Sequence, residues 1–469
     1  MVFSSVTFLC FFLPVVITLH TLFRSIKIRN ILLVTASLFF YAWGEPIWVL
    51  LLMVSSTLDY VCARVMEAHP SSWKRKAARW VSLCGNIGVL IAFKYTGFIV
   101  ANLNDAFGLG LPVPSFSLPL GISFYTFQTL SYSINVYKGR MKCQRNYIKY
   151  LAYVTMFPQL VAGPIVYYGD IAQSLDDRSV TAADIYRGFS RFIIGLSKKI
   201  LLANLCGEAI TLLPVSGGGQ PLSFAGSWLL IVLFALQIFF DFSGYSDMAI
   251  GLGRMVGFDF LENFEYPYIS KSISEFWRRW HMSLGAFFRE YVYIPLGGNR
   301  VNRLRLVFNL MVVWALTGLW HGASWNFVVW GAYYGVLIIL ERLFLGSLLE
   351  KLPNIISTLW TLLLVLLGWS LFYYDSLSAG LHHIGAMLGI TSVGVTDPAT
   401  VFVFKENAVL LLVAVLCCLP WKKWFEKWFA GKFLSSDYIL KPVILSVLLL
   451  ISVSFLIGQS FNPFLYFRF

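Results

Sequence analysis

Long runs of apolar residues, separated by short polar stretches, dominate the chain. Residues 356–372 and 440–456, for example, approach the ~20 apolar residues that a helix needs to cross a ~30 Å hydrocarbon core. Because lipid cannot satisfy backbone N–H and C=O groups, such runs must be helical, and they lack the two-residue alternation of an outer-membrane barrel strand. The pattern therefore predicts an all-α polytopic integral membrane protein.

The number of apolar runs predicts about eleven or twelve transmembrane crossings. The runs lie near residues 4–23, 30–43, 47–63, 80–100, 119–136, 200–213, 225–241, 306–320, 325–340, 355–373, 406–419 and 440–458. Residues 150–170 break the pattern because Pro158, Gly163 and Pro164 interrupt them, which predicts a re-entrant or in-plane segment covered by protein. Residues 251–305 are rich in Arg, Trp, Phe and Tyr and predict interfacial helices in part.

Basic residues are spread over several short loops, and their distribution predicts the topology. The net charge is +13 and 58% of the residues are hydrophobic, but no basic domain or arm indicates nucleic-acid binding. Loops 64–79 and 138–149 are basic, whereas loops 102–118, 216–223 and 374–404 contain no Lys or Arg. The positive-inside rule places the first group in the cytoplasm and the second outside, with both chain termini outside.

The stretch LTGLWHGASWNF, residues 316–327, contains His321 between two apolar runs. The run before it, 306–320, is about 15 residues or roughly 22 Å of helix, shorter than the ~30 Å core, which predicts that His321 lies at bilayer depth. Small residues flank the imidazole, namely Gly318, Gly322 and Ala323. They allow another backbone or a slender ligand to approach closely. A partly desolvated imidazole is a competent general base near neutral pH; the alternative is a neutral histidine bonded to a neighbouring helix.

Other polar side chains near the ends of apolar runs are candidates for supporting roles. His281, in RRWHMSL, is either an interfacial residue or a functional one. In FFDFSGYSDMAIG, Asp241 and Asp247 either orient a histidine, cap the following helix or lie in a solvated loop. The remaining histidines are interpreted as structural: His20, His69, His382 and His383. Seven cysteines show no metal-ligand spacing, so we expect no metal site.

Several motifs together resemble the membrane-bound O-acyltransferase family. They are PLGISFYTFQTLSYSINVYKG (119–139), FPQLVAGPI (157–165), FFDFSGYSDMAIGLGRMVGFDFLENFEYPYISKSISEFWRRWHMSL (239–284) and GLWHGASWNF (318–327). The similar branch is bacterial and contains alginate O-acetyltransferase and the related cellulose and peptidoglycan O-acetylation proteins. The likeness extends from SLFFYAWGEP (37–46) through Arg342.

The resemblance implies a ring of helices around a thin central wall, with a funnel entering from each face. It implies a single domain over residues 1–469, with a core at 37–345, C-terminal helices at 355–460 and an aromatic tail at 461–469. The essential histidine of the family matches His321, and its second position matches His281. Four residues are expected to support them: Asp241, Asp247, Trp320 and Asn326.

The tail FNPFLYFRF carries Tyr466 between phenylalanines. One interpretation is an aromatic belt at the membrane interface. The tail also resembles a C-terminal motif of acyl-relay systems in the same family, in which a tyrosine hydroxyl receives the acyl group. A hydroxyl with an unperturbed pKa of about 10 is a weak nucleophile until a base removes its proton.

The resemblance implies transfer of an acetyl group across the inner membrane of a bacterium, for O-acetylation of a periplasmic or exported polysaccharide. Acetyl-CoA is the expected co-substrate, bound near Arg278, Arg279 and Trp280, and we expect no tightly bound cofactor. His321 would act as the base and Tyr466 as the acyl carrier. The expected partners are a periplasmic acetyltransferase, a polysaccharide synthesis complex and membrane lipid, with no nucleic acid.

Three other functions remain open at this point. The first is direct O-acylation of a polymer or lipid-linked acceptor without Tyr466. The second is a transporter or proton channel in which His321 relays protons, although the chain has neither the internal repeat nor the paired acids within spans that this class favours. The third is a scaffold subunit of a synthesis complex, which needs neither a buried histidine nor broken helices.

Overall fold

The computed structural model describes residues 1–214, 222–421, 437–458 and 465, and these residues form helices joined by loops, with no strand among them. The all-α prediction is confirmed. The chain divides into two compact units. Unit 1 contains residues 1–192 and 246–261, and unit 2 contains residues 193–245 and 262–469. The predicted single domain is not tested by this division.

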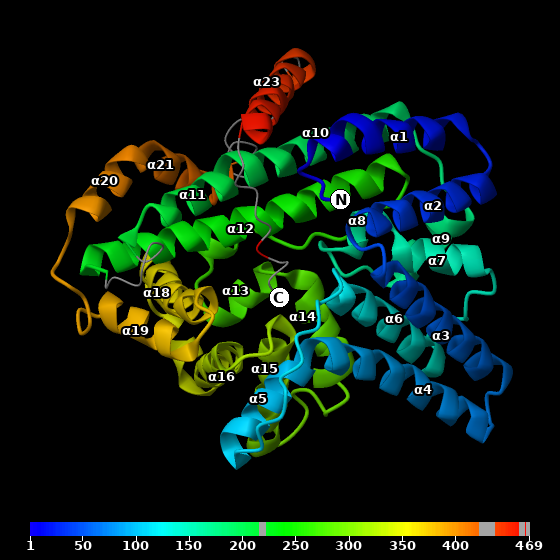
Figure 1. Cartoon of the computed structure of the whole chain (residues 1–469), viewed down its shortest axis with the longest axis horizontal. Coiled ribbons are helices and arrows are strands. Elements are labelled where there is room, and N and C mark those ends of the chain that lie inside the picture. Colours follow the sequence, from blue (N-terminus) through cyan, green and yellow to red (C-terminus); the bar gives the residue numbers. More distant parts are fainter. Residues whose placement is uncertain (215–221, 422–436, 459–464, 466–469) are drawn as a thin grey trace. The chain divides into compact units, whose positions relative to one another are not determined.

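Unit 1 is built around a group of packed helices from the first third of the chain (Figure 1). Its helices are α1 (Leu13–Leu22), α2 (Ile26–Gly44), α3 (Trp48–Ala68), α4 (Trp73–Leu90), α5 (Thr96–Phe107), α6 (Ile122–Tyr137), α7 (Tyr147–Thr155), α8 (Phe157–Leu160) and α9 (Tyr168–Asp176). Asp59 on α3 joins α4 and α6 by accepting hydrogen bonds from Ser82, from Asn86 at 2.7 Å and from Ser133 at 3.2 Å. Such polar contacts hold helices together where lipid supplies no hydrophobic driving force.

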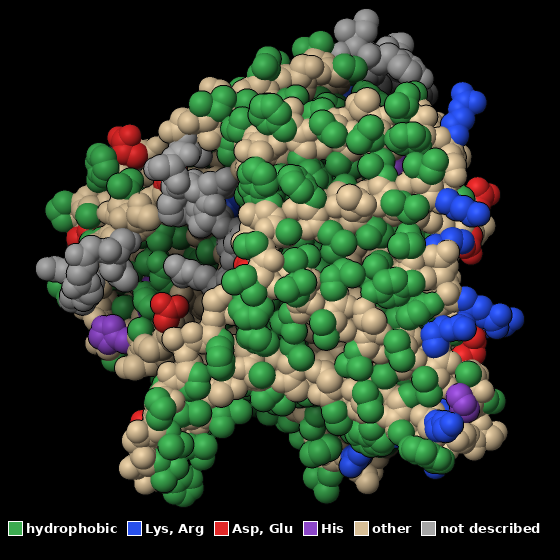
Figure 2. Space-filling view, turned by 45° about the vertical axis from the view of Figure 1, so that its right-hand side comes forward, with side chains coloured by type: hydrophobic (Ala, Val, Ile, Leu, Met, Phe, Trp, Pro, Cys, Tyr) green, Lys and Arg blue, Asp and Glu red, His purple; other side chains and the backbone are tan. Residues whose placement is uncertain are grey.

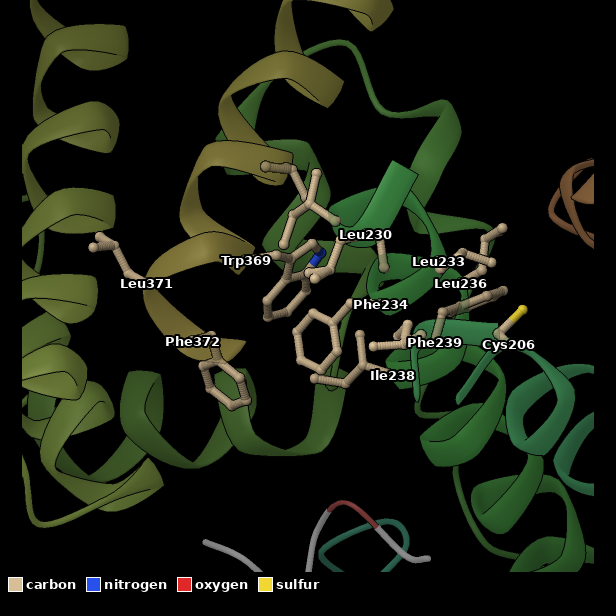
Figure 3. Packing of buried hydrophobic residues seen from close by; sticks show 14 of the residues in the cluster. Cys206, Leu230, Leu233, Phe234, Leu236, Ile238, Phe239, Trp369, Leu371 and Phe372 are labelled. Carbon is tan, nitrogen blue, oxygen red and sulfur yellow. The ribbon is translucent and has the colours of Figure 1, made fainter. Parts of the chain in front are cut away.

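Unit 2 contains the helices that follow α10 (Ala182–Ser197), apart from the last turns of α12. They are α11 (Leu205–Thr211), α12 (Phe224–Met255), α13 (Ile273–Arg279), α14 (Met282–Phe288), α15 (Arg303–His321), α16 (Trp325–Leu340), α17 (Gly346–Leu349), α18 (Asn354–Tyr373), α19 (Leu377–Met387), α20 (Pro398–Glu406), α21 (Ala408–Cys417) and α23 (Asp437–Gly458). Figure 3 shows its hydrophobic core, where Phe234 of α12 lies beside Trp369 and Phe372 of α18. This core supports the helix ends that carry the site described below.

Eight helices in the described ranges are long and apolar enough to cross a membrane, and nine are if the bent pair α20–α21 forms one span. The eight are Ile26–Gly44, Trp48–Ala68, Trp73–Phe107, Phe224–Met255, Arg303–His321, Trp325–Leu349, Asn354–Tyr373 and Leu440–Gly458. This number is smaller than the predicted eleven or twelve because some apolar runs form shorter helices, such as α6 with 16 residues. Figure 2 shows a broad hydrophobic surface with Lys and Arg side chains gathered along one edge.

Two predictions about interrupted segments are tested by burial. Residues 151–166 are all buried, and Pro158 lies in the four-residue helix α8. The prediction that protein covers this broken segment is confirmed. In residues 251–305, two seven-residue helices, α13 and α14, meet at Trp280 and His281. Trp280 is buried and is paired with Phe264 through an isolated antiparallel bridge, so α13 and α14 are folded into unit 2, whereas residues 251–261 belong to unit 1.

Helices α15 and α16 cross at unusually close range because glycines meet at the crossing. A Cβ atom built on Gly331 would lie 2.4 Å from the carbonyl oxygen of Trp314, and one on Gly318 would lie 2.3 Å from that of Phe327. No side chain can occupy either position without moving a helix. The prediction that Gly318 permits close approach of another backbone is confirmed.

Candidate functional site

His321 is the last residue of α15 and is 3% exposed. The helix ends there because Gly322 adopts an extended conformation. It has 19 residues, or roughly 28 Å, and begins earlier than the predicted apolar run because Asn302 caps it by accepting a hydrogen bond from the Arg305 backbone N–H at 2.9 Å. The predicted placement of His321 at bilayer depth is not tested by this length.

The tautomer of His321 follows from one hydrogen bond. Its Nδ1 lies 2.8 Å from the carbonyl oxygen of Thr317, one turn earlier in α15. Because a carbonyl oxygen can only accept, Nδ1 carries the hydrogen, and in the neutral ring Nε2 carries the lone pair. The orientation that a general base requires is therefore fixed by the backbone of its own helix.

Aromatic rings surround the imidazole of His321. The ring centroids of Trp320, Trp330 and Phe372 lie 4.9, 4.8 and 5.5 Å from its centroid. These rings come from α15, α16 and α18, so three helices restrict the rotation of the imidazole. An apolar wall of this kind also strengthens any electrostatic interaction that the ring makes.

His281 is held in an unusual backbone conformation between α13 and α14. Its φ angle is +47°, in the left-handed region that few residues other than glycine adopt. The side-chain oxygen of Asn263 lies 3.1 Å from Nδ1 of His281 and also accepts hydrogen bonds from the backbone and hydroxyl of Ser283. Asn263 thus fixes both the imidazole ring and the turn that carries it. These contacts hold the strained backbone of His281 in place.

The structure brings the two predicted histidines together around one indole. Trp320 lies 5.8 Å from His281 and 4.9 Å from His321, measured between ring centroids. Phe242 of α12 packs edge-on against the other side of His281 at 4.7 Å. Residues more than forty positions apart in the sequence therefore form one site, with Trp320 in contact with both imidazoles.

A cavity of about 190 Å³, here called the aromatic cavity, reaches His281 and Thr317. It is lined by Trp277, Trp280, His281, Leu284, Gly285, Phe288, Arg289, Tyr293, Leu310, Val313, Trp314, Thr317 and Arg342. Thr317 is the residue whose carbonyl holds His321, so the cavity extends to within one helical turn of the proposed base. Its apolar walls suit a slender, uncharged part of a ligand.

A second cavity of about 420 Å³, here called the polar cavity, is lined by charged residues. They include three cations, Lys271, Arg278 and Arg342, and other lining residues are Ser272, Ser274, Glu275, Glu341, Gly346, Leu349, Glu350 and Asn354. Arg342 belongs to the lining of both cavities. Three carboxylates balance these cations, and two of them already have partners: Glu275 pairs with Arg279, and Glu341 accepts hydrogen bonds from Ile273 and Ser274.

The three residues predicted to bind the donor have different surroundings. Arg278 lines the polar cavity and Trp280 lines the aromatic cavity. Arg279 lines neither, because its guanidinium forms an ion pair with Glu275 one turn earlier, at 2.7 Å. These positions leave the binding roles as predictions.

The residues predicted to support the histidines also differ in what they contact. Asn326 donates to the carbonyl oxygens of Tyr374 at 2.8 Å and Leu371 at 3.4 Å, which ties the start of α16 to the end of α18. Asp247 forms an ion pair with Arg191 at 2.7 Å within unit 1. Asp241 forms a buried ion pair with Lys199 and does not bond to either histidine in the described contacts.

Tyr466 lies outside the described residues, but its neighbour Leu465 is described. The backbone N–H of Leu465 donates to Asp241 at 2.8 Å, and its side chain packs against the hydrophobic core of unit 2. Asp241 immediately precedes Phe242, the residue in contact with His281. Leu465 is therefore held at the turn of α12 that contacts His281.

Several residues of this site escaped the sequence analysis. In the sequence analysis Arg342 marks only the end of the family likeness, and Asn263, Lys271 and Arg289 are not singled out. A cation two residues beyond an apolar helix is a topology signal in sequence, and nothing local indicates that it faces a cavity. Asn263 lies 18 residues before His281. A spacing of that length predicts no contact by itself.

Burial affects the protonation of His281 and His383, which lie outside the membrane-spanning helices. Burial, with a smaller contribution from nearby His321, holds the pKa of His281 well below its usual value. Burial likewise lowers the pKa of His383 to about 4. Both imidazoles are therefore neutral at physiological pH, and the cations available to an anionic ligand are the arginines and Lys271.

Comparison with known proteins identifies what this site resembles. The sequence profile of the membrane-bound O-acyltransferase family matches residues 142–349, which include both histidines. Over their full lengths, the chain is 35% identical to a probable alginate O-acetylase of Azotobacter vinelandii. It is 40% identical to the corresponding protein of Pseudomonas aeruginosa over 80% of this chain and 73% of that one. A peptidoglycan O-acetyltransferase of Helicobacter pylori is 30% identical over 93% of this chain and 91% of its own.

The neutral state of His281 makes stability depend on pH. Below about pH 6.5 the unfolded chain binds a proton on this histidine, whereas the folded protein does not. The free energy of unfolding therefore decreases as the pH falls below that value. Because the folded protein keeps this imidazole neutral, its free energy of unfolding decreases by about 2 kcal/mol between pH 7.5 and pH 5. We expect the Tm of the detergent-purified protein to fall over this range, and to fall less steeply in His281→Gln. Equal slopes in both proteins would contradict this assignment.

Proposed function

Because the chain belongs to the membrane-bound O-acyltransferase family, we propose that it transfers an acetyl group from acetyl-CoA to a bacterial polysaccharide, with His321 as the general base. The observation that carries the proposal is the bond from Nδ1 of His321 to the Thr317 carbonyl, beside a cavity that reaches Thr317. With the hydrogen on Nδ1, the lone pair of the neutral ring is on Nε2, and the thioester would approach through the aromatic cavity, which extends to Thr317. The names of the similar proteins support an acetyl group and a polysaccharide acceptor.

The two cavities suit the two ends of the donor. The phosphates of acetyl-CoA would meet Lys271, Arg278 and Arg342 in the polar cavity, since guanidinium groups bind phosphate oxygens in pairs. The pantetheine arm, which is long and thin, would pass Arg342 into the aromatic cavity toward His281 and Thr317. His281, neutral and fixed by Asn263, would position the thioester by hydrogen bonding and not by charge.

The transfer step needs one base and one nucleophile. Nε2 of His321 removes the proton from the Tyr466 hydroxyl as the phenolic oxygen forms a bond to the thioester carbonyl carbon. The carbon–sulfur bond then breaks, and the imidazolium returns the proton to the departing thiolate. The product is an acetyl-tyrosine ester on the enzyme and free CoA. General base catalysis of this type contributes about 10²–10⁴-fold, and positioning contributes more.

The acetyl ester would then be passed to an acceptor on the other side of the membrane. A periplasmic acetyltransferase would take the acetyl group from Tyr466 and transfer it to the polysaccharide that a synthesis complex exports. This order of events places the enzyme in the inner membrane with both chain termini in the periplasm. The hydrogen bond between Leu465 and Asp241 supports a role for Tyr466, because it holds the residue that precedes Tyr466 in the chain at a turn of α12.

Replacing the base should abolish transfer without unfolding the protein. His321→Gln should lower acetyl transfer by at least 10²–10⁴-fold because the amide cannot accept the proton. Labelled acetyl-CoA and purified protein in detergent provide the measurement, and the Tm checks folding. His69→Gln is a matched control, since Nδ1 of His69 also bonds a carbonyl four residues earlier, at 3.2 Å. Normal transfer by a folded His321→Gln protein would exclude the proposed mechanism.

Replacing the carrier distinguishes the relay from direct acylation. In Tyr466→Phe the hydroxyl is absent, so we expect no acetyl label on the C-terminal peptide and no acetylated polymer. The label is located by digestion and mass spectrometry of protein incubated with labelled acetyl-CoA. Polymer acetylation that continues in Tyr466→Phe would favour direct transfer to the acceptor, with His321 still required. Accumulation of labelled wild-type peptide would rule out the transporter and scaffold functions.

Removing a cation that is proposed to contact acetyl-CoA should weaken the binding of acetyl-CoA more than that of a donor without nucleotide phosphates. Arg342→Gln loses charge-assisted hydrogen bonds, and we expect the KM for acetyl-CoA to rise roughly tenfold or more. The KM for an acetyl thioester of pantetheine, which lacks the nucleotide phosphates, should change much less. Lys351→Gln, an exposed cation outside both cavity linings, is the control. Equal increases for both donors would show that Arg342 does not bind the phosphates.

A further inference from the structure

A buried ion pair joins two segments of unit 2. Nζ of Lys199, in the π-helical turn Lys198–Asn204, lies 2.7 Å from Oδ1 of Asp241 on α12. The two side chains are 3% and 2% exposed. Burying two charges is costly unless further hydrogen bonds satisfy them, and apolar residues of similar volume are often as stable or more stable. The pair therefore calls for an explanation beyond stability.

The second oxygen of Asp241 indicates what the pair does. Oδ2 accepts the backbone N–H of Leu465 at 2.8 Å, across 224 positions of sequence. Each carboxylate oxygen thus has its own partner: Lys199 neutralises the charge through one, and the other holds a backbone group of the chain end. The side chain of Leu465 adds a second attachment by packing against the hydrophobic core of unit 2.

The ion pair is also close to the histidine site. Asp241 lies between Phe240, which is fully buried, and Phe242, whose ring packs 4.7 Å from that of His281. The turn of α12 that supports His281 is therefore the turn that binds Leu465. Leu465 is therefore held next to the residue that contacts His281, and Trp320 contacts both His281 and His321.

We propose that Lys199 and Asp241 form a clamp that holds the backbone of Leu465 beside the histidine site, and that acetyl transfer to the next residue in the chain, Tyr466, depends on this clamp. This inference rests on the proposed relay through Tyr466, and it makes both clamp residues positioning residues. A charge-assisted hydrogen bond shifts the equilibrium between bound and released Leu465 by roughly ten- to a hundred-fold, which would keep Leu465 bound during the reaction.

The decisive variant removes the clamp without leaving a buried charge. Lys199→Met combined with Asp241→Leu replaces both charges by apolar side chains, a change that often preserves or raises stability. Asp241→Asn alone leaves Lys199 unpaired and serves as a second variant if it folds. The matched control is Arg191→Met with Asp247→Leu, which removes another ion pair of α12, also 2.7 Å long, without touching Leu465.

Carboxypeptidase digestion of the full chain in detergent measures how firmly the segment is held. We expect digestion past Leu465, followed by intact-protein mass spectrometry, to be roughly ten- to a hundred-fold faster in the double clamp variant than in wild type. The control variant should be digested at the wild-type rate. Unchanged protection in a clamp variant whose Tm equals that of wild type would overturn the proposal.

Kinetics separate this clamp from the relay on which it rests. The double clamp variant should keep the wild-type KM for acetyl-CoA, because the cavities are intact, while kcat for acetylation of Tyr466 falls at least tenfold. If the ion pair had a purely structural role, the double variant would change neither the rate of digestion nor the kcat for acetylation of Tyr466. If protection is lost in the clamp variant but Tyr466→Phe still acetylates polymer, the clamp is upheld as an anchor of the chain end and the relay is rejected.

Discussion

The hydrogen bond from Nδ1 of His321 to the carbonyl of Thr317 is the interaction on which the rest of the site depends. The accepting carbonyl belongs to the residue one turn earlier in the same helix, α15, which ends at His321. The helix end therefore supplies the orienting partner that many catalytic histidines obtain from a carboxylate. Since that partner is uncharged, the site needs no buried acid next to the base.

The surroundings of the base are also largely uncharged. Aromatic rings from three helices pack around the imidazole, and a second histidine is held by an asparagine instead of an aspartate. Charged groups are placed farther out, in the polar cavity, where Lys271, Arg278 and Arg342 can meet an anionic ligand. The arrangement separates the part of a donor that needs charge from the part that must react away from water.

Sequence reasoning reached the fold class, the family and the two histidines because these leave local signals. Apolar run length indicates helices, and the motifs around His281 and His321 are contiguous in the chain. Arg342 and Asn263 could not be found in this way, because their importance depends on contacts between distant segments. Asp241 is a candidate in the sequence because a carboxylate near a histidine motif can orient a histidine, cap a helix or lie in a loop. Its contacts with Lys199 and Leu465 could not be predicted, because both partners are distant in sequence.

The glycine crossing of α15 and α16 has a consequence for how the protein works. Gly318 and Gly331 let the two backbones touch, so a larger residue at either position would push the helices apart. Because His321 ends α15 and Trp330 belongs to α16, the distance between these two rings depends on that backbone contact. A residue without a side chain, placed three positions before the imidazole, therefore sets the width of the pocket around it.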